Sequence, residues 1–246
     1  MKKLHINIII QARLGSTRLP GKILRPILGR PMLSYLIERV RRIQHSHRLI
    51  VATTLLPLDD EIVSYCETEN VLYYRGSEED VLDRYYQTCC HFPTDLIVRI
   101  TSDCPLIDPA IIDQAISLMI KNSSQLDYVS NTLLRTFPRG MDVEVFTFQA
   151  LKIAAQEASR PFDREHVTPY IYKHPDLFNI ANLVYMADEA KYRLTVDTVE
   201  DFNLVNKIFE NLYPTNKNFT LTDILDILRV HPEWKKINAH IKQKET

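Results

Sequence analysis

Glycine, cysteine and long apolar runs are all scarce in this chain of 246 residues, and the last two scarcities each exclude a class of protein. The four cysteines contain no Cys-x-x-Cys pair, so they favour reduced packing residues in a cytoplasmic protein over disulfides or zinc ligands. No stretch approaches the ~20 apolar residues of a membrane span. Long basic runs are also missing, and 30 basic against 31 acidic residues give a net charge of −1. We therefore expect neither a membrane nor a nucleic acid as partner.

Acidic residues are absent before Glu38. Three of the five glycines, Gly15, Gly21 and Gly29, fall in this acid-free segment and alternate with basic residues, directly after the apolar run Ile6–Ile10. A strand, a flexible basic loop and a helix are how many α/β proteins present backbone N–H groups and cations to phosphates. The segment thus predicts an anion-binding loop, although a solvated basic loop with ordinary turns is the plain alternative.

The two best-known phosphate motifs do not fit this loop. A P-loop has four residues between its glycines and then Lys-Ser/Thr, whereas five residues separate Gly15 from Gly21, and Lys22 precedes Ile23. The dinucleotide fingerprint needs a closer glycine spacing and an acidic residue after the second strand, where this chain has Thr53 and Thr54.

Apolar strand patterns alternate with helical patterns over the first 131 residues. Such alternation predicts an α/β protein, with a mostly parallel sheet covered by helices on both faces. The length suits a single domain over residues 1–246. The expected strands are Ile6–Ile10, Leu49–Thr53, Val71–Tyr74, Leu96–Thr101 and Tyr128–Asn131, and the expected helices are Met32–Ile43, Asp59–Glu69, Glu78–His91 and Ala110–Lys121.

The regularity ends after Asn131, and we interpret residues 132–190 as an excursion from the sheet. Many of its apolar side chains are too far from the parallel sheet to be buried wholly by it, so they predict a homodimer interface. They include Val143, Val145, Phe146, Phe148, Phe162, Ile171, Tyr172 and Phe178. Within and after it we expect a turn at 138–140, strands Val143–Phe148 and Tyr192–Val196, and helices Ala150–Ala158, Arg164–Tyr172, Val199–Phe209, Leu221–Arg229 and Pro232–Ile241.

Two aspartates directly follow strand patterns, Asp103 after Leu96–Thr101 and Asp197 after Tyr192–Val196. Ligands of open α/β sheets bind outside the carboxyl ends of the strands. Two carboxylates there suit Mg²⁺, which takes one or two carboxylates together with phosphate oxygens and water. The alternative is that each aspartate only caps the next helix. Cys104, beside Asp103, is a candidate reactive thiol, but an isolated cysteine is more often a small buried hydrophobe.

The run from Gln11 to Lys22, Gln-Ala-Arg-Leu-Gly-Ser-Thr-Arg-Leu-Pro-Gly-Lys, closely resembles the phosphate-binding signature of the sugar-acid cytidylyltransferases. The ketodeoxyoctonate enzymes carry it, as do their relatives in spore-coat polysaccharide biosynthesis. Further segments resemble the spore-coat branch: Tyr74–Leu82, Thr101–Leu106, Asp142–Val145, Arg164–Pro169 and Thr195–Asp201.

This resemblance implies a three-layer, Rossmann-like fold of the nucleotide-diphospho-sugar transferase type and transfer of a nucleotidyl group. An acceptor oxygen would attack the α-phosphorus of CTP and release pyrophosphate. Arg13 and Lys22, as exposed loop cations, would hold the triphosphate, and Mg²⁺ would bridge it to Asp103 and Asp197, so that Arg13, Lys22 and Asp103 are the implied catalytic residues. Further implied nucleotide contacts are Gly15, Ser16, Arg18, Thr53, Arg75 and Asp80.

For the acceptor, the resemblance implies Arg164 and His166 beside a sugar-acid carboxylate, with Arg139 and Asp142 as weaker candidates. A keto-acid sugar, another sugar and an amino or phosphonate alcohol all stay open as the acceptor. Two rival functions also stay open. A glycosyltransferase of the same fold would often carry an Asp-x-Asp motif, but Cys104 and Pro105 follow Asp103 here. A non-catalytic nucleotide-binding protein would keep the fold and lose Lys22 or the metal carboxylates.

Overall fold

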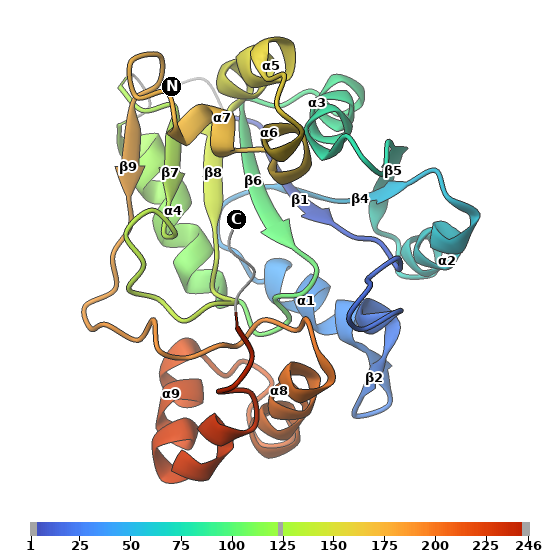
Figure 1. The fold of residues 1–246 in the computed structure, drawn as a ribbon, viewed down its shortest axis with the longest axis vertical. Helices are drawn as coiled ribbons and strands as arrows, with labels where there is room; N and C mark the ends of the chain where they lie inside the picture. The colour runs from blue at the N-terminus through green and yellow to red at the C-terminus, as the bar shows by residue number, and fades with distance from the viewer. Residues whose placement is uncertain (1–3, 123–124, 243–246) are drawn as a thin grey trace.

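A seven-stranded sheet forms the centre of the protein, in the order β5-β4-β1-β6-β8-β7-β9 (Figure 1). The computed structural model describes residues 4–122 and 125–242, so both ends of the predicted domain 1–246 lie outside the described residues. The strands of the sheet are β1 Ile6–Gln11, β4 Arg48–Thr54, β5 Leu72–Gly76, β6 Leu96–Thr101, β7 Tyr128–Ser130, β8 Glu144–Thr147 and β9 Ile180–Asn182. A separate two-stranded hairpin, β2 Pro26–Ile27 with β3 Arg30–Pro31, was not predicted.

The sheet is mostly parallel, as the alternation predicts. Strands β5, β4, β1 and β6 pair in parallel, and so do β7 and β9. Only β8 runs antiparallel to its neighbours, β6 and β7. The carboxyl ends of β1, β4 and β6 therefore meet at one edge, and in Figure 1 the arrow of β6 points toward the end of the molecule where α8 lies.

Helices cover both faces of the sheet because the strands are apolar on both sides. Ile8 and Ile10 of β1 belong to one buried cluster, which α1, α2, α4, α8 and α9 complete, whereas Ile9 between them belongs to a second cluster with α3, α5 and α7. This alternation follows from the two-residue period of a strand. The helices are α1 Met32–Val40, α2 Asp60–Thr68, α3 Val81–His91, α4 Pro109–Lys121, α5 Phe148–Glu157, α6 Pro161–His166, α7 Pro169–Tyr172, α8 Val199–Leu212 and α9 Leu221–Val230.

The expectation that residues 132–190 leave the sheet is wrong in part, since β8 and β9 belong to it. Antiparallel β8 inserts between β6 and β7, an order that hydrophobic pattern alone does not encode. Several of the apolar side chains assigned to a dimer interface are consequently buried within one chain. They are Val143, Val145, Phe146, Ile171 and Phe178. The homodimer itself stays a prediction.

The predicted strand Tyr192–Val196 does not form a ladder. Its single bridge joins Arg193 to Arg139, and Leu194 N donates to Arg139 O across 2.7 Å. Leu194 and Val196 are buried, which explains the strand-like alternation. Gly140 (φ +96) makes the approach possible, because a Cβ there would lie 2.6 Å from the Leu194 carbonyl carbon.

Other predicted boundaries differ locally. The predicted helix Arg164–Tyr172 is two helices, α6 and α7, because the chain breaks at Val167 and a new helix begins at Pro169. The predicted helix Pro232–Ile241 is only a 3₁₀ turn over Pro232–Lys236. Two further 3₁₀ turns span Lys22–Leu24 and Pro57–Asp59. Among the helices in the described ranges, none has the length and apolar character needed to cross a membrane.

Candidate active site

The basic loop after β1 folds back on itself at the carboxyl edge of the sheet. Gly21 N donates to Leu14 O, and Gly21 adopts a left-handed conformation (φ 67) that favours glycine. The buried carboxylate of Asp59 accepts from Leu14 N at 2.7 Å and also binds the hydroxyl of Thr54 at the end of β4. Asp59 therefore fixes the loop to the neighbouring strand.

A backbone contact brings the two predicted metal carboxylates to this loop. Val196 N donates to Asp103 O across 2.8 Å, so the segment before Asp197 lies beside the turn after β6. Lys22 then joins both aspartates. Its Nζ lies 3.3 Å from Asp103 Oδ2 and 3.0 Å from Asp197 Oδ1, and donates to Val196 O at 2.7 Å.

Lys22 is buried rather than exposed, contrary to the expectation for a loop lysine. Burial lowers its pKa, but the charges of Asp103 and Asp197 more than offset this and raise the pKa above the ordinary lysine value. Burial likewise works against the charge of Asp197, yet Lys22, Arg18 and Arg193 lower the pKa of that carboxyl. Both groups are therefore charged at neutral pH.

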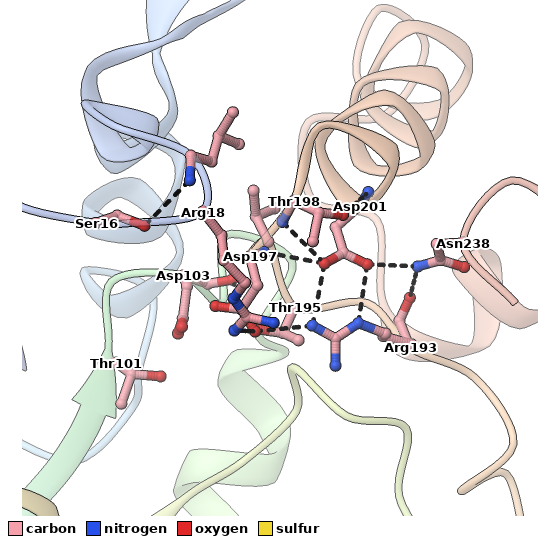
Figure 2. A network of polar contacts seen from close by, with 12 residues as sticks. Ser16, Arg18, Thr101, Asp103, Arg193, Thr195, Asp197, Thr198, Asp201 and Asn238 are labelled. Carbon is pink, nitrogen blue, oxygen red and sulfur yellow. Dashed lines mark hydrogen bonds and ion pairs between the residues drawn. The ribbon is translucent and has the colours of Figure 1, made fainter. Parts of the chain in front are cut away.

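Arg18 and Arg193 both point toward Asp197 in Figure 2. Their guanidinium nitrogens lie 3.0 Å and 2.7 Å from Asp197 Oδ2. Arg193 also binds the fully buried Asp201, which in turn accepts from the N–H groups of Asp197 and Thr198. Three cations thus converge on one aspartate.

Asp197 is not the residue that caps the next helix. Thr198 is the N-cap of α8, and it forms a capping box with Asp201. Asp103 lies in the turn after β6, whereas Asp108 caps α4 by accepting from Ala110 N. The alternative interpretation of Asp103 and Asp197 as capping residues is therefore wrong, and their carboxylates face Lys22 instead.

Two cavities meet at Asp103 and Asp197. The first, which we call the loop cavity, has a volume of about 300 Å³ and is lined by the basic loop, including Arg13, Gly15, Ser16, Arg18 and Lys22. Arg84 of α3 adds a further cation, nearly buried, whose Nε has no hydrogen-bond partner in the described part of the chain. Another nitrogen of the same group, Nη1, donates to Ser77 O at 2.8 Å. Together with Arg13 and Arg18, Arg84 gives this cavity a positive charge that favours an anionic ligand.

The second cavity, the sheet cavity, has a volume of about 840 Å³ and shares six lining residues with the first: Gln11, Arg18, Thr101, Asp103, His166 and Asp197. Its wall is a polar network on the sheet. Glu144 of β8 binds Arg99 of β6, the hydroxyl of Tyr128 and the hydroxyl of Thr168. Arg99 also donates to Gln11 at 3.1 Å.

The charges of the sheet cavity are mostly paired internally. Asp142 accepts two hydrogen bonds from Arg135, and Glu144 pairs with Arg99. Arg139 lines the same cavity, and within residues 4–122 and 125–242 no carboxylate pairs with it at salt-bridge distance. Burial and the nearby charge of Arg135 lower the pKa of Arg139. The charge of Asp142 acts in the opposite sense. Arg139 is therefore a cation of this cavity that forms no salt bridge in the described ranges.

Four of the predicted site residues lie outside both cavities. Thr53 is fully buried in β4, and Arg75 binds Asp60 and the carbonyls of Thr54 and Leu56. Asp80 is the N-cap of α3. Arg164 is bound to Asp80 at 2.9 Å and to the carbonyls of Ala155 and Ala158. These contacts hold elements together and leave Arg164 little capacity for a ligand.

Several residues that line or support the site were not predicted. Arg99 and Glu144 interrupt apolar strands, and a charged side chain inside a buried strand is itself a signal, because it needs a partner or a ligand. Arg84 gave no such signal, since a charged residue in an amphipathic helix is ordinary. The support from Asp59 and Asp201 depends on hydrogen bonds to distant backbone that sequence patterns do not reveal.

A metal site of three or more His, Cys, Asp or Glu side chains does not occur among the described residues. The pair Asp103 and Asp197 nevertheless fits Mg²⁺, because both present carboxylate oxygens to a single point now held by Lys22. Two carboxylates with phosphate oxygens are a sufficient donor set. Cys104 is buried, and burial together with Asp103 raises the pKa of its thiol well above the ordinary value. It is therefore no reactive nucleophile.

Comparison with known proteins agrees with this geometry. The sequence profile of the cytidylyltransferase family matches residues 7–244. The spore coat polysaccharide biosynthesis protein SpsF of Bacillus subtilis is 33% identical over 237 residues, which cover 93% of this chain and 95% of SpsF.

The solved structures that are similar to this chain include two enzymes that use or are related to CTP chemistry by name. A cytidylyltransferase from Leptospira borgpetersenii superposes with a TM-score of 0.89 at 33% identity, over 98% of both chains. CMP:2-keto-3-deoxy-manno-octonic acid synthetase complexed with CTP superposes with a TM-score of 0.65 at 18% identity, over 83% of this chain and 98% of the synthetase. The fold is thus the Rossmann-like fold of the nucleotidyltransferases, and this chain is a nucleotidyltransferase that belongs to the cytidylyltransferase family.

Proposed function

We propose that this enzyme transfers CMP from CTP to a hydroxyl group of a sugar or sugar acid, in the presence of Mg²⁺, with release of pyrophosphate. The observation that carries the proposal is the position of Lys22 in the loop cavity, where it pairs with Asp103 and Asp197, two carboxylates that line both cavities. One cavity is basic enough for a triphosphate, and the other is large enough for a sugar.

The loop cavity would hold the triphosphate. Arg13, Arg18 and Arg84 line it together with Lys22, so four cations border the space that the phosphate groups would occupy. Arg13 makes only a weak contact with Glu78, at 3.4 Å, so little energy is lost when it turns to a phosphate. Preorganised cations at the leaving pyrophosphate are among the largest contributions to such transfers.

Asp103 and Asp197 would hold Mg²⁺. When bound, the ion neutralises phosphate oxygens and makes the α-phosphorus more open to attack. Lys22 pairs with both carboxylates, so the cation for the phosphates and the carboxylates that would hold Mg²⁺ lie at the same point of the site. The site is therefore suited to bind nucleotide and metal together.

The sheet cavity would hold the acceptor. Because Arg99 and Arg135 are already paired with Glu144 and Asp142, Arg139 is the cation available for an anionic group. We therefore favour an acceptor with one carboxylate, and Arg139 rather than Arg164 as its partner. The chemistry is a substitution at phosphorus. The acceptor oxygen bonds to the α-phosphorus while the bond between the α-phosphorus and the oxygen that bridges it to the β-phosphate breaks. Pyrophosphate leaves with the electron pair of that bond.

The relatives supply the remaining part of the proposal. The CTP complex of the octonic acid synthetase supports CTP as nucleotide, and SpsF supports a role in surface polysaccharide biosynthesis. A glycosyltransferase would instead consume a finished nucleotide sugar. Pyrophosphate release separates the two functions, because only nucleotidyl transfer produces it.

The test is pyrophosphate release with each of the four ribonucleoside triphosphates and Mg²⁺, against a panel of sugar acids and their neutral analogues. We expect release only with CTP, only with an acceptor present, and faster with acids than with neutral analogues. Release without any acceptor would identify a hydrolase. A lack of release with every pair, together with turnover of a nucleotide sugar, would support the glycosyltransferase instead.

A further inference from the structure

His166 lies where the two cavities meet, at the last residue of α6. It lines both the loop cavity and the sheet cavity, so it borders on the space for the nucleotide and the space for the acceptor. Its ring packs against Phe162 with centroids 4.5 Å apart. Neither ring nitrogen hydrogen-bonds to any residue in 4–122 or 125–242. The imidazole group is thus free to exchange a proton with a ligand.

The backbone after His166 is strained. Val167 has φ 73 and ψ −57, a conformation that a β-branched residue rarely adopts. Two anchors hold it there. The side chain of Val167 is fully buried in the core beneath α7, and the hydroxyl of Thr168 binds Glu144 on the sheet. Because these two contacts hold the strained turn in place, they also determine the position of the His166 ring.

The surroundings favour the neutral imidazole. Burial lowers the pKa of His166 below its ordinary value of 6.5. Arg99 of β6 and Lys173 after α7 lower it further, while Glu165 beside it and Glu144 of β8 act in the opposite sense. Arg18, Asp103 and Asp197 also border the same space. At pH 7 the ring therefore has a nitrogen lone pair available to accept a proton.

From this placement we infer that His166 is the general base of the reaction. The inference rests on the proposed function. As the acceptor oxygen bonds to the α-phosphorus, a ring nitrogen of His166 takes the hydroxyl proton, and the electron pair of the O–H bond stays on the attacking oxygen. The bond to the bridging oxygen breaks, and pyrophosphate leaves. The imidazolium ion then releases its proton to water, which restores the neutral ring.

The variant that tests this role is His166→Gln, which keeps a hydrogen-bonding side chain of similar length but cannot carry the proton. We expect kcat to fall about 100-fold to 10,000-fold near neutral pH, the usual contribution of a positioned base, with KM for CTP nearly unchanged. In the wild type, kcat should fall as the pH drops through the pKa of His166. We call this fall of kcat at low pH the acid limb. In His166→Gln the acid limb should vanish, and the residual rate should rise with hydroxide concentration.

His174→Gln is the matched control, because His174 lies in the same segment, binds the Tyr170 carbonyl and lines neither cavity. It should keep both kcat and the acid limb. Melting temperatures of both variants check the fold, and His166→Asn serves if His166→Gln is unstable. If His166→Gln keeps kcat and the acid limb but has a raised KM for the acceptor, His166 is only a binding residue. That result would overturn the inference and leave the proposed function intact. No turnover by the wild type with any acceptor would overturn the proposed function, and the inference with it.

Discussion

The ammonium group of Lys22 lies 3.0 Å from Asp197 Oδ1, although 175 positions separate the two residues in the sequence. This ion pair joins the first loop of the chain to the segment before α8, and Asp103 completes it from the turn after β6. The ion pair stabilises the fold and also lies at the centre of the proposed site. Variants there should therefore change stability and turnover together, to different degrees.

Lys22→Ala should reduce CTP turnover by at least ~100-fold, because it removes a cation at the reacting phosphates. It should also destabilise the fold by about 1–3 kcal/mol, since Asp103 and Asp197 lose their shared partner. The loss stays moderate because Arg18 and Arg193 still face Asp197. Pyrophosphate release and thermal melting measure the two effects. Lys121→Ala, at an exposed position on α4, is the control and should change neither.

Asp103→Asn and Asp197→Asn should each weaken Mg²⁺-dependent turnover by at least ~100-fold, while the side-chain volume stays almost the same. If both carboxylates hold one ion, the double variant should lose little more than either single variant. Asp197→Asn should be the less stable of the two, because it removes a charge that three cations share. Activity measured over a range of Mg²⁺ concentrations tests this, with Asp226→Asn, exposed on α9, as control. Curves that match the wild type in both single variants would remove the metal site.

The sequence predicted the first half of the fold well because its strands and helices are long, apolar and regularly spaced. It failed at Tyr192–Val196, where burial of Leu194 and Val196 imitates a strand without a pairing partner. It also missed the insertion of β8 between β6 and β7. Strand order depends on long-range packing, and a pattern of buried residues carries no information about it.

The sequence indicated those candidate site residues that directly follow a strand pattern, because the ends of parallel strands lie at one edge of the sheet. The basic loop, Asp103 and Asp197 all follow expected strands or strand-like segments, so they meet at the carboxyl edge. Arg164 is a different case. Its motif suggested a ligand, but Asp80 and two carbonyls already occupy its guanidinium group. Whether an arginine has a free hydrogen-bonding edge depends on tertiary contacts, which a motif does not contain.

Arg139→Gln should raise KM for an acidic acceptor by about 10-fold to 100-fold, since a charge-assisted hydrogen bond contributes about 1.5–3 kcal/mol. KM for CTP and kcat should change little. Arg164→Gln is the informative comparison: it should lower the melting temperature, because Asp80 and the end of α5 lose their partner, with a smaller effect on acceptor KM. The opposite ranking of the two variants in acceptor KM would assign the carboxylate to Arg164.

The homodimer prediction now depends on exposed apolar residues in 132–190. Leu134 is 65% exposed and Met186 is 95% exposed, and Asn182 binds the backbone of Leu134 at both its N–H and its carbonyl. A second copy of the chain would bury this surface. We expect light scattering to give a dimer at micromolar concentration and a monomer for the double variant Leu134→Glu with Met186→Glu. Leu55→Glu, exposed elsewhere, should stay dimeric. A monomeric wild type would contradict the prediction.

The most direct test of the central claim is mass spectrometry of the product formed from CTP and an acidic sugar with Mg²⁺. We expect a product with the mass of the acceptor plus CMP less one water, one pyrophosphate for each product molecule, and loss of both in Lys22→Ala. Free CMP without the conjugate, or conjugate formation undiminished in Lys22→Ala, would contradict the assignment of nucleotidyl transfer to this site.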